Sequence, residues 1–198
     1  MELNGSAEPR RIVVAISGAS GACLGVGVLK ALREAPGIEA HAVVSEAGWR
    51  NLRLELAMSP SDLRPLAAQV HDVADIGASI ASGSFRAEGM AIVPCSMRTL
   101  AAVAHGLSDN LITRAADVML KERRRLVLVA REAPLHLVHL RNMVAVTEMG
   151  GIVCPPVPTF YLKPQTVQDI VDQSVARVLD LLDVPHTLAA RWAGEAAA

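Results

Sequence analysis

The sequence predicts a single α/β domain of three layers, in which helices cover a doubly wound parallel sheet. Short apolar runs alternate along the chain with stretches of helical periodicity, which is the order of elements in such sheets. Residues 12–16 read Ile-Val-Val-Ala-Ile, a run typical of a strand buried on both faces. The 198 residues are 52% hydrophobic, which indicates a sheet covered on both faces or a large subunit interface.

The strands are expected where apolar runs lie next to turn signals. Pro36-Gly37 marks the turn before the second strand, and Pro94 stops the third. The expected strands are 12–16, 39–44, 90–93, 126–129 and 152–153.

The helices are expected between these strands. Ser45 caps one helix, Asp62 caps a short one that ends at Leu66, and Gly150-Gly151 ends another. The stretch from 71 to 87 is small and polar, which predicts a long functional loop. The expected helices cover 23–32, 46–56, 63–66, 95–105, 110–121, 135–149 and 167–182. We expect one domain over 1–198, with a core of about 11–184 and a C-terminal tail from 185 to 198.

Charge and composition argue against several classes of function. The net charge of -1 argues against general nucleic-acid binding. No apolar run reaches membrane-spanning length, and residues 1–11 contain no signal-peptide hydrophobic region, so a cytoplasmic protein without membrane contact is expected. The three cysteines, Cys23, Cys95 and Cys154, form neither a zinc pattern nor a C-x-x-C pair. Of the 19 basic residues only three are lysines, and arginines suit phosphates and buried ion pairs.

Ligands of doubly wound sheets bind beyond the carboxyl ends of the strands, so the chemistry is expected at 17–21, Ser45, 94–99 and 131–132. Residues 17–22 read Ser-Gly-Ala-Ser-Gly-Ala, which lets a backbone approach a ligand closely. The free amides at the start of the next helix would face an anion there. This segment matches neither standard nucleotide-binding motif, so an ordinary tight connection is the alternative.

Some residues have both a chemical and a structural interpretation. Glu132 follows a buried strand and could protonate a leaving oxygen, or it could form a structural ion pair with Arg131. The charged run 121–125 ends a helix, and most of it is expected to be a solvated face. His136 and His139 are spaced like metal ligands, but no third ligand is evident nearby, so no metal site is expected.

A family resemblance is carried by seven segments: Ser17-Gly18-Ala19-Ser20-Gly21-Ala22, Ala81-Ser82-Gly83-Ser84, Pro94-Cys95-Ser96-Met97-Arg98-Thr99, Arg114-Ala115-Ala116-Asp117, Leu120-Lys121-Glu122-Arg123-Arg124, Arg131-Glu132-Ala133-Pro134-Leu135 and Phe160-Tyr161. In this order and spacing they resemble the flavin prenyltransferases of the UbiX/Pad type, formerly described as phenylacrylic acid or hydroxybenzoate decarboxylases. The resemblance extends from Arg11 to about Trp192.

The resemblance implies a flavodoxin-like or Rossmann-like subunit, assembled into a homododecamer with active sites where subunits meet. It implies that reduced FMN receives a dimethylallyl group from dimethylallyl monophosphate at its central-ring nitrogen. Ring closure then gives prenylated FMN, the cofactor of UbiD-type decarboxylases. The expected protein is therefore a cofactor-maturation enzyme, and a UbiD-type decarboxylase receives its product.

The resemblance also implies residue roles. Ser20 and Glu55 would relay or hold protons near the flavin, and Glu132 would protonate the departing phosphate. FMN would be held by Gly18, Ala19, Ser20, Ser45, Ser96, Met97, Arg98, Thr99 and Arg131. The prenyl phosphate would be neutralised without a metal by Ser82, Arg114, Lys121, Arg131, Tyr161 and Arg177, and Lys121 is also counted as catalytic. The aromatic faces of Tyr161 and Trp192 would favour an allylic cation.

Leu24, Glu46 and Arg125 depart from the common family pattern, and they bear on FMN affinity and on the shape of the prenyl pocket. One alternative is a flavin-dependent cysteine decarboxylase, which shares the fold, but this chain lacks the Pro-x-Met-Asn-x-x-Met-Trp segment of those enzymes. A second alternative is a non-catalytic flavin carrier. Such a protein has no need of Lys121 and Glu132, which this chain retains.

Overall fold

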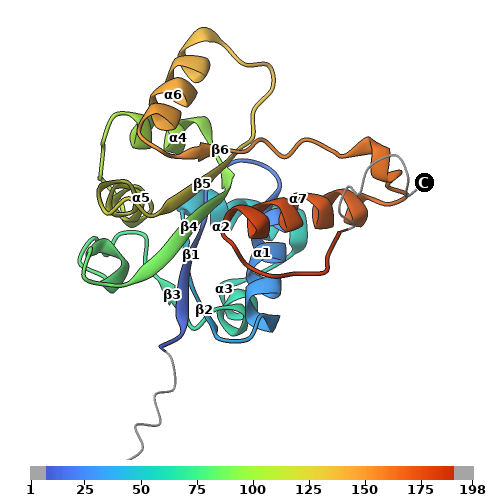
Figure 1. Ribbon diagram of the computed structural model, residues 1–198, viewed down its shortest axis with the longest axis horizontal. Coiled ribbons are helices and arrows are strands. Elements are labelled where there is room, and N and C mark those ends of the chain that lie inside the picture. Colours follow the sequence, from blue (N-terminus) through green and yellow to red (C-terminus); the bar gives the residue numbers. More distant parts are fainter. Residues whose placement is uncertain (1–7, 190–198) are drawn as a thin grey trace, which may run out of the picture.

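Six strands form one parallel sheet in the computed structural model, which describes residues 8–189. Their order across the sheet is β3-β2-β1-β4-β5-β6 (Figure 1). All neighbouring strands pair in parallel, so their carboxyl ends share one edge of the sheet. The strands are β1 Arg10–Ile16, β2 Ile38–Val44, β3 Gln69–His71, β4 Ala87–Cys95, β5 Arg125–Ala130 and β6 Ile152–Val153.

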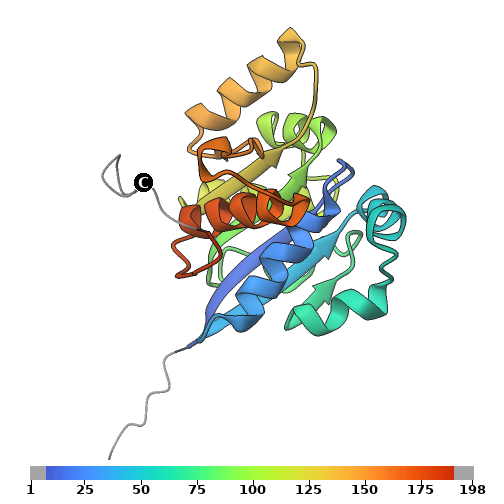
Figure 2. The same cartoon turned by 90° about the vertical axis from the view of Figure 1, so that its right-hand side faces the viewer.

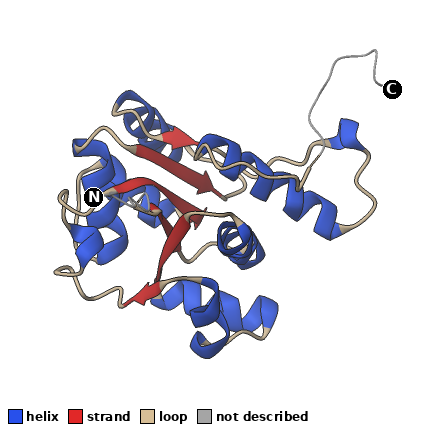
Figure 3. Ribbon diagram, turned by 60° about the horizontal axis from the view of Figure 1, so that its bottom comes forward, coloured by secondary structure: helices blue, strands red, loops and turns tan. Residues whose placement is uncertain are grey.

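Helices cover both faces of this sheet, which gives the three layers seen in Figure 3. On one face α1 and α7 lie side by side, with α2 near the carboxyl end of β1 (Figure 2). The other face packs against α4, α5 and the inner side of α6. The helices are α1 Ala22–Glu34, α2 Glu46–Leu56, α3 Pro60–Leu63, α4 Met97–Ala104, α5 Leu111–Lys121, α6 Leu137–Glu148 and α7 Val167–Leu181. Short 3-10 turns cover Arg64–Leu66, Ser79–Ala81 and Phe160–Leu162.

The predicted fold class is confirmed, with local corrections. The edge strand β3 was missed, because it has three residues and only His71 among them is fully buried. The third expected strand is longer than predicted and includes Pro94, at an irregularity in the pairing of β4 with β5 where a missing N–H is tolerated. Asp62 does not cap the short helix. Ser59 occupies the N-cap, and the Asp62 carboxylate accepts a hydrogen bond from the Ser59 amide at 2.8 Å.

The outer side of α6 and the arm between β6 and α7 leave apolar side chains in solvent. Leu137, Val138, Leu140 and Val144 are exposed on α6, and Phe160 is exposed on the arm. Figure 1 shows α6 and the arm extending away from the sheet. No helix in residues 8–189 is long and apolar enough to cross a membrane.

Candidate functional site

The sheet reverses its winding between β1 and β4, and Ser17 joins the two strand ends there. The chain winds outward through β2 and β3, then returns to place β4 beside β1. The buried Ser17 hydroxyl donates to the Pro94 carbonyl at 2.9 Å and accepts from the Ser96 amide at 2.8 Å. These bonds hold the turns after β1 and β4 side by side at the position where doubly wound sheets bind ligands.

The turn after β1 is held by α2. A Cβ on Gly18 would come within 2.6 Å of the Ala47 Cβ, so the close approach of the turn to α2 requires glycine. The Asn51 side chain donates to the Ala19 carbonyl at 2.8 Å. Ser20 remains exposed on the outer side of this fixed turn.

The amides at the start of α1 were expected to be free for a ligand, but Glu55 binds two of them. Its carboxylate accepts hydrogen bonds from the amides of Gly21 at 3.0 Å and Ala22 at 2.8 Å. The negative charge therefore sits at the positive end of the α1 dipole, where an external anion was expected. A phosphate at this edge must use the other donors.

Ser45 and Ser96 begin α2 and α4 at the same edge. Ser45 Oγ accepts from the Gly48 amide at 3.0 Å, which leaves its own proton for a ligand. Ser96 Oγ accepts from the Thr99 amide at 3.3 Å and donates to Thr99 Oγ1 at 3.1 Å. Met97 packs partly into the core.

The Arg98 side chain does not lie free for a phosphate. It forms an ion pair with Asp109, and this hydrogen bond lowers the pKa of the Asp109 carboxyl below its ordinary value. Arg98 therefore offers a ligand at this edge its backbone, while its guanidinium is engaged elsewhere.

Arg131 and Glu132 continue this edge beyond β5. The Arg131 amide donates to the Cys95 carbonyl at 3.1 Å, which fixes the backbone beside the Ser96 turn. Both side chains are exposed, and Glu132 Oε1 accepts from the Ala133 amide at 3.0 Å. Within residues 8–189 neither side chain forms an ion pair, so the expected alternative of a structural pair is not supported.

Tyr161 and Arg177 line a separate groove of about 800 Å³ between α7 and the arm. The Thr159 amide donates to the Gln173 side chain at 3.1 Å, which ties the arm to α7. Burial raises the pKa of the Cys154 thiol in this groove, and the Arg177 guanidinium opposes that rise. Val129 also lines the groove, so it begins near the end of β5.

Ser82, Arg114 and Lys121 form a third group near the amino ends of β4 and β5. Arg114 Nε donates to the Ala81 carbonyl at 3.1 Å. Lys121 pairs with Glu122, and a Cβ on Gly83 would come within 2.9 Å of Lys121 Nζ. The Ser82 turn and Lys121 are therefore in direct proximity.

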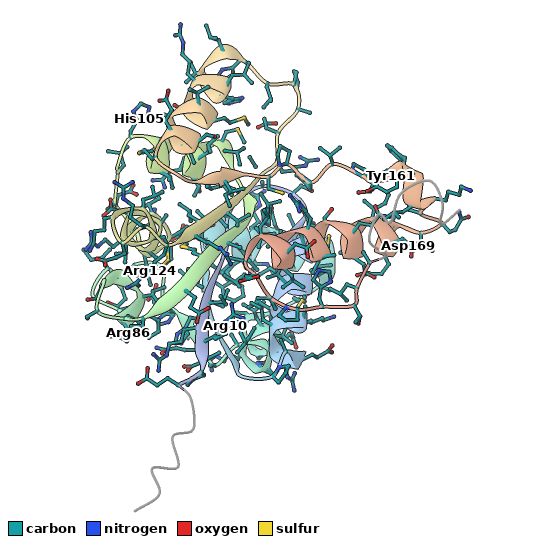
Figure 4. All side chains as sticks on the ribbon, viewed as in Figure 1. Arg10, Arg86, His105, Arg124, Tyr161 and Asp169 are labelled. Atoms are coloured by element: carbon teal, nitrogen blue, oxygen red, sulfur yellow. The ribbon has the colours of Figure 1, made fainter. Side chains whose placement is uncertain are left out.

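The sequence-predicted residues thus occupy opposite edges of one subunit. Lys121 precedes β5 and Glu132 follows it, and its six extended residues span roughly 20 Å. Figure 4 likewise shows Arg124, which follows Lys121 closely, far from Tyr161. One subunit does not bring all the predicted phosphate ligands together.

The sequence also singled out Trp192 and the pair His136 and His139. Trp192 lies outside the described residues. In the described part of the chain, no group of three or more His, Cys, Asp or Glu side chains is arranged to hold a metal ion. His136 Nδ1 accepts from the Val138 amide at the start of α6, and its ring stacks on His139.

Comparison with known proteins identifies the family. Residues 1–179 match the flavoprotein family model. Flavin prenyltransferase UbiX of Thauera aromatica is 54% identical over 184 residues, which are 93% of this chain and 94% of that protein. The chain belongs to the UbiX-type flavin prenyltransferases. Membership in this family excludes the two alternative functions, a flavin-dependent cysteine decarboxylase and a non-catalytic flavin carrier.

Solved structures of UbiX-type proteins agree with the fold. A crystal structure of AnUbiX in complex with FMN and dimethylallyl pyrophosphate superposes with a TM-score of 0.91 at 54% identity, covering 94% of this chain and 98% of that one. A dodecameric FMN-dependent Ubix-like decarboxylase from Escherichia coli O157:H7 also gives 0.91, at 50% identity, covering 93% and 100%.

Sequence reasoning missed several residues that shape the sites of this UbiX-type subunit. Ser17 was read as part of a small-residue turn, and its buried hydroxyl was not singled out. Asn51 lies on a helix with no motif around it, and only the fold reveals its bond to Ala19. Arg124 belongs to the run 121–125, most of which was expected to be a solvated face, yet it donates to the carbonyls of Gly83 and Phe85, both at 2.7 Å.

Proposed function

We propose that this enzyme transfers the dimethylallyl group of dimethylallyl monophosphate to reduced FMN and releases prenylated FMN. The observation that carries the proposal is the pair Arg131-Glu132, exposed and without ion-pair partners in the described chain, at the edge organised by Ser17. Gly18, Ala19, Ser20, Ser45, Ser96, Met97, Arg98 and Thr99 would hold the flavin there, Met97 and Arg98 through their backbone.

Charged and hydroxyl side chains supply the proton and the anion-binding groups that this transfer needs. The allylic C–O bond breaks, a bond to the central-ring nitrogen forms, and phosphate departs. Glu132 donates a proton to the departing phosphate oxygen, and Arg131 holds its negative charge. Lys121, Tyr161 and Arg177 complete the anion site, with Ser82 and Arg114 in support. Ser20, beside the flavin, relays the proton that leaves the nitrogen toward the Glu55 carboxylate at the next residues of the turn.

We infer that the complete site forms between subunits. The split of Lys121 and Glu132 to opposite edges supports this, since no rearrangement within β5 can join them. The apolar outer side of α6 supports an extensive subunit contact. The dodecameric relative from Escherichia coli supports twelve copies. We place the enzyme in the cytoplasm, with a UbiD-type decarboxylase as the recipient of its product.

A direct assay tests the reaction. The protein is mixed under anaerobic conditions with reduced FMN and dimethylallyl monophosphate, and the flavin is analysed by mass spectrometry. We expect a flavin that has gained one five-carbon unit, and a parallel reaction with the diphosphate shows which donor the enzyme uses. An FMN-loaded, folded protein that forms no adduct with either donor would refute the proposal.

A further inference from the structure

Two buried histidines form a hydrogen-bonded pair that the proposed chemistry does not use. His41 on β2 and His71 on β3 are 3% and 6% exposed. His41 Nδ1 lies 3.0 Å from His71 Nε2, and His41 Nε2 lies 3.0 Å from Glu39 Oε1. Because the Glu39 carboxylate accepts, His41 Nε2 carries a proton, and the bridge between the two rings then holds one hydrogen.

The pair therefore accommodates a single bridging proton. A fully protonated pair would direct two N–H donors at each other and break the bridge. Burial lowers the pKa of His71, as does neighbouring His41, while Asp75 opposes the shift. Further charged groups lie next to the histidine pair. Glu39 contacts His41, Arg11 lies 3.4 Å from Glu39, and Glu8 lies 3.8 Å from Arg11.

His41 also supports the ring of Phe85. The two ring centroids are 4.9 Å apart in an edge-on arrangement, and the Arg11 guanidinium lies 5.3 Å from the Phe85 centroid. Phe85 closes a tight turn, because its amide donates to the Ser82 carbonyl at 3.2 Å. The ring that His41 contacts therefore belongs to the turn that carries Ser82.

This turn places Ser82 beside Lys121. Ser82 Oγ lies 2.8 Å from Ser84 Oγ, and Gly83 lies against the Lys121–Glu122 pair. Arg114 and Arg124 fix the turn backbone from α5 and its C-terminal end. The His41–Phe85 contact fixes the apolar side of the turn, on the side of the short strand β3.

The geometry points to His41 and His71 as positioning residues for the Ser82 turn, which they release when a second proton enters the bridge between His41 Nδ1 and His71 Nε2. The link to prenyl transfer rests on the proposed role of Ser82 and Lys121. The positioning of the turn by the two histidines does not depend on that proposed role.

Hydrogen exchange of residues 81–86 tests the positioning without substrate. We compare the wild-type protein with His71→Leu, which leaves His41 Nδ1 unpaired, and with His71→Gln, which keeps a hydrogen-bonding group but cannot be protonated. His105→Gln, at an exposed histidine after α4, is the matched control. At pH 7.5 we expect exchange about tenfold faster in His71→Leu and unchanged in the other two, after correction for intrinsic rates.

The pH response separates positioning from general stability. Because the pKa of His71 is lowered from its ordinary 6.5, corrected exchange of residues 81–86 should rise only below pH 6.5 in the wild type and in His105→Gln, and should stay flat in His71→Gln. Equal rises in all three proteins would overturn the protonation step. If His71→Leu does not fold, Phe85→Leu takes its place, and unchanged exchange in that variant would overturn the positioning role.

Kinetics then tests the consequence for the reaction. His71→Leu should raise the KM for dimethylallyl monophosphate about tenfold and change kcat and FMN affinity little, and His71→Gln should restore the KM. A protein that makes no prenylated flavin refutes the proposed function, while the exchange data still decide the role of the pair. Faster exchange with an unchanged KM would refute the connection to substrate.

Discussion

Glu55 shows how one carboxylate can serve the fold at the edge of a binding site. Its bonds to Gly21 and Ala22 stabilise the start of α1 and hold the Ser20 turn in place. The sequence suggested an acid near the flavin, but not that its charge would occupy the helix amides. Its expected role with protons stays a prediction, and any such role must coexist with this capping.

Ser17→Ala is expected to weaken the edge where β1 and β4 meet. The substitution removes the acceptor of the Ser96 amide, and an unsatisfied amide of this kind costs about 1–3 kcal/mol. We expect a lower melting temperature and about tenfold weaker FMN binding, measured by flavin fluorescence. Ser61→Ala, at an exposed position, is the control and should change neither.

Glu132→Gln separates chemistry from binding. The amide keeps the shape of the side chain but cannot donate a carboxylic proton, so prenyl transfer should slow by about 100-fold or more. FMN binding should change less than about threefold, because Glu132 is not among the proposed flavin contacts. Rapid-mixing kinetics and fluorescence titration measure the two quantities. Equal losses in both would assign Glu132 a structural role.

The sequence predicted the types of residue at the site better than their arrangement. The turn after β1, the serine caps and the Arg131-Glu132 pair all lie at one edge, because parallel strands bring their carboxyl ends together. Ser82 and Lys121 lie at the other edge. Spacing along a chain does not reveal which edge a residue occupies, so the proposed role of Ser82 and Lys121 was accessible only through the family resemblance.

At the scale of elements, the long strands and helices were predictable and the short ones were not. β1, buried over residues 12–16, and the strongly periodic α5 stand out, because each is long enough to repeat its pattern. β3 has too few residues for a pattern, and the 3-10 turn at Phe160–Leu162 is exposed. The extent of β4 was missed because Pro94 normally ends a strand.

The start of α7 is expected to loosen in acid. The amides of Gln165 and Thr166, at 2.8 and 2.9 Å, lower the pKa of the Asp169 carboxyl below its ordinary 3.8. A lowered pKa means that the unfolded chain takes up the proton first. The stabilisation is therefore present above pH 3.8 and is lost as the pH falls through the folded pKa.

Amide exchange at residues 165–169 measures this loosening. It should rise below about pH 4, after correction for intrinsic rates, and Asp169→Asn should show the raised exchange already at pH 7. The start of α4 is the internal control, because its cap Ser96 accepts from the Thr99 amide and does not titrate, and its first turn holds no acidic residue. Equal loosening of both helix starts would indicate global unfolding instead.

At the scale of the whole molecule, the proposed site residues of one subunit are divided between two edges of the sheet. A site that joins Lys121 to Glu132 must take them from different copies, because β5 keeps the two apart within each chain. The exposed apolar side of α6 indicates where such copies gain contact area. Assembly and catalysis are then coupled, and dissociated subunits should bind flavin weakly and transfer no prenyl group.

Subunit mixing tests this arrangement. Lys121→Ala and Glu132→Gln should each be nearly inactive alone. In oligomers formed by coexpression in equal amounts, about a quarter of the sites would combine a native Lys121 from one copy with a native Glu132 from another. Activity should therefore return to about a quarter of the wild-type value.

Mixing Lys121→Ala with Ser82→Ala is the matched control, because both residues belong to one edge of one chain, and no site regains both. A mixture of the first pair that stays inactive would mean that each site draws Lys121 and Glu132 from the same chain.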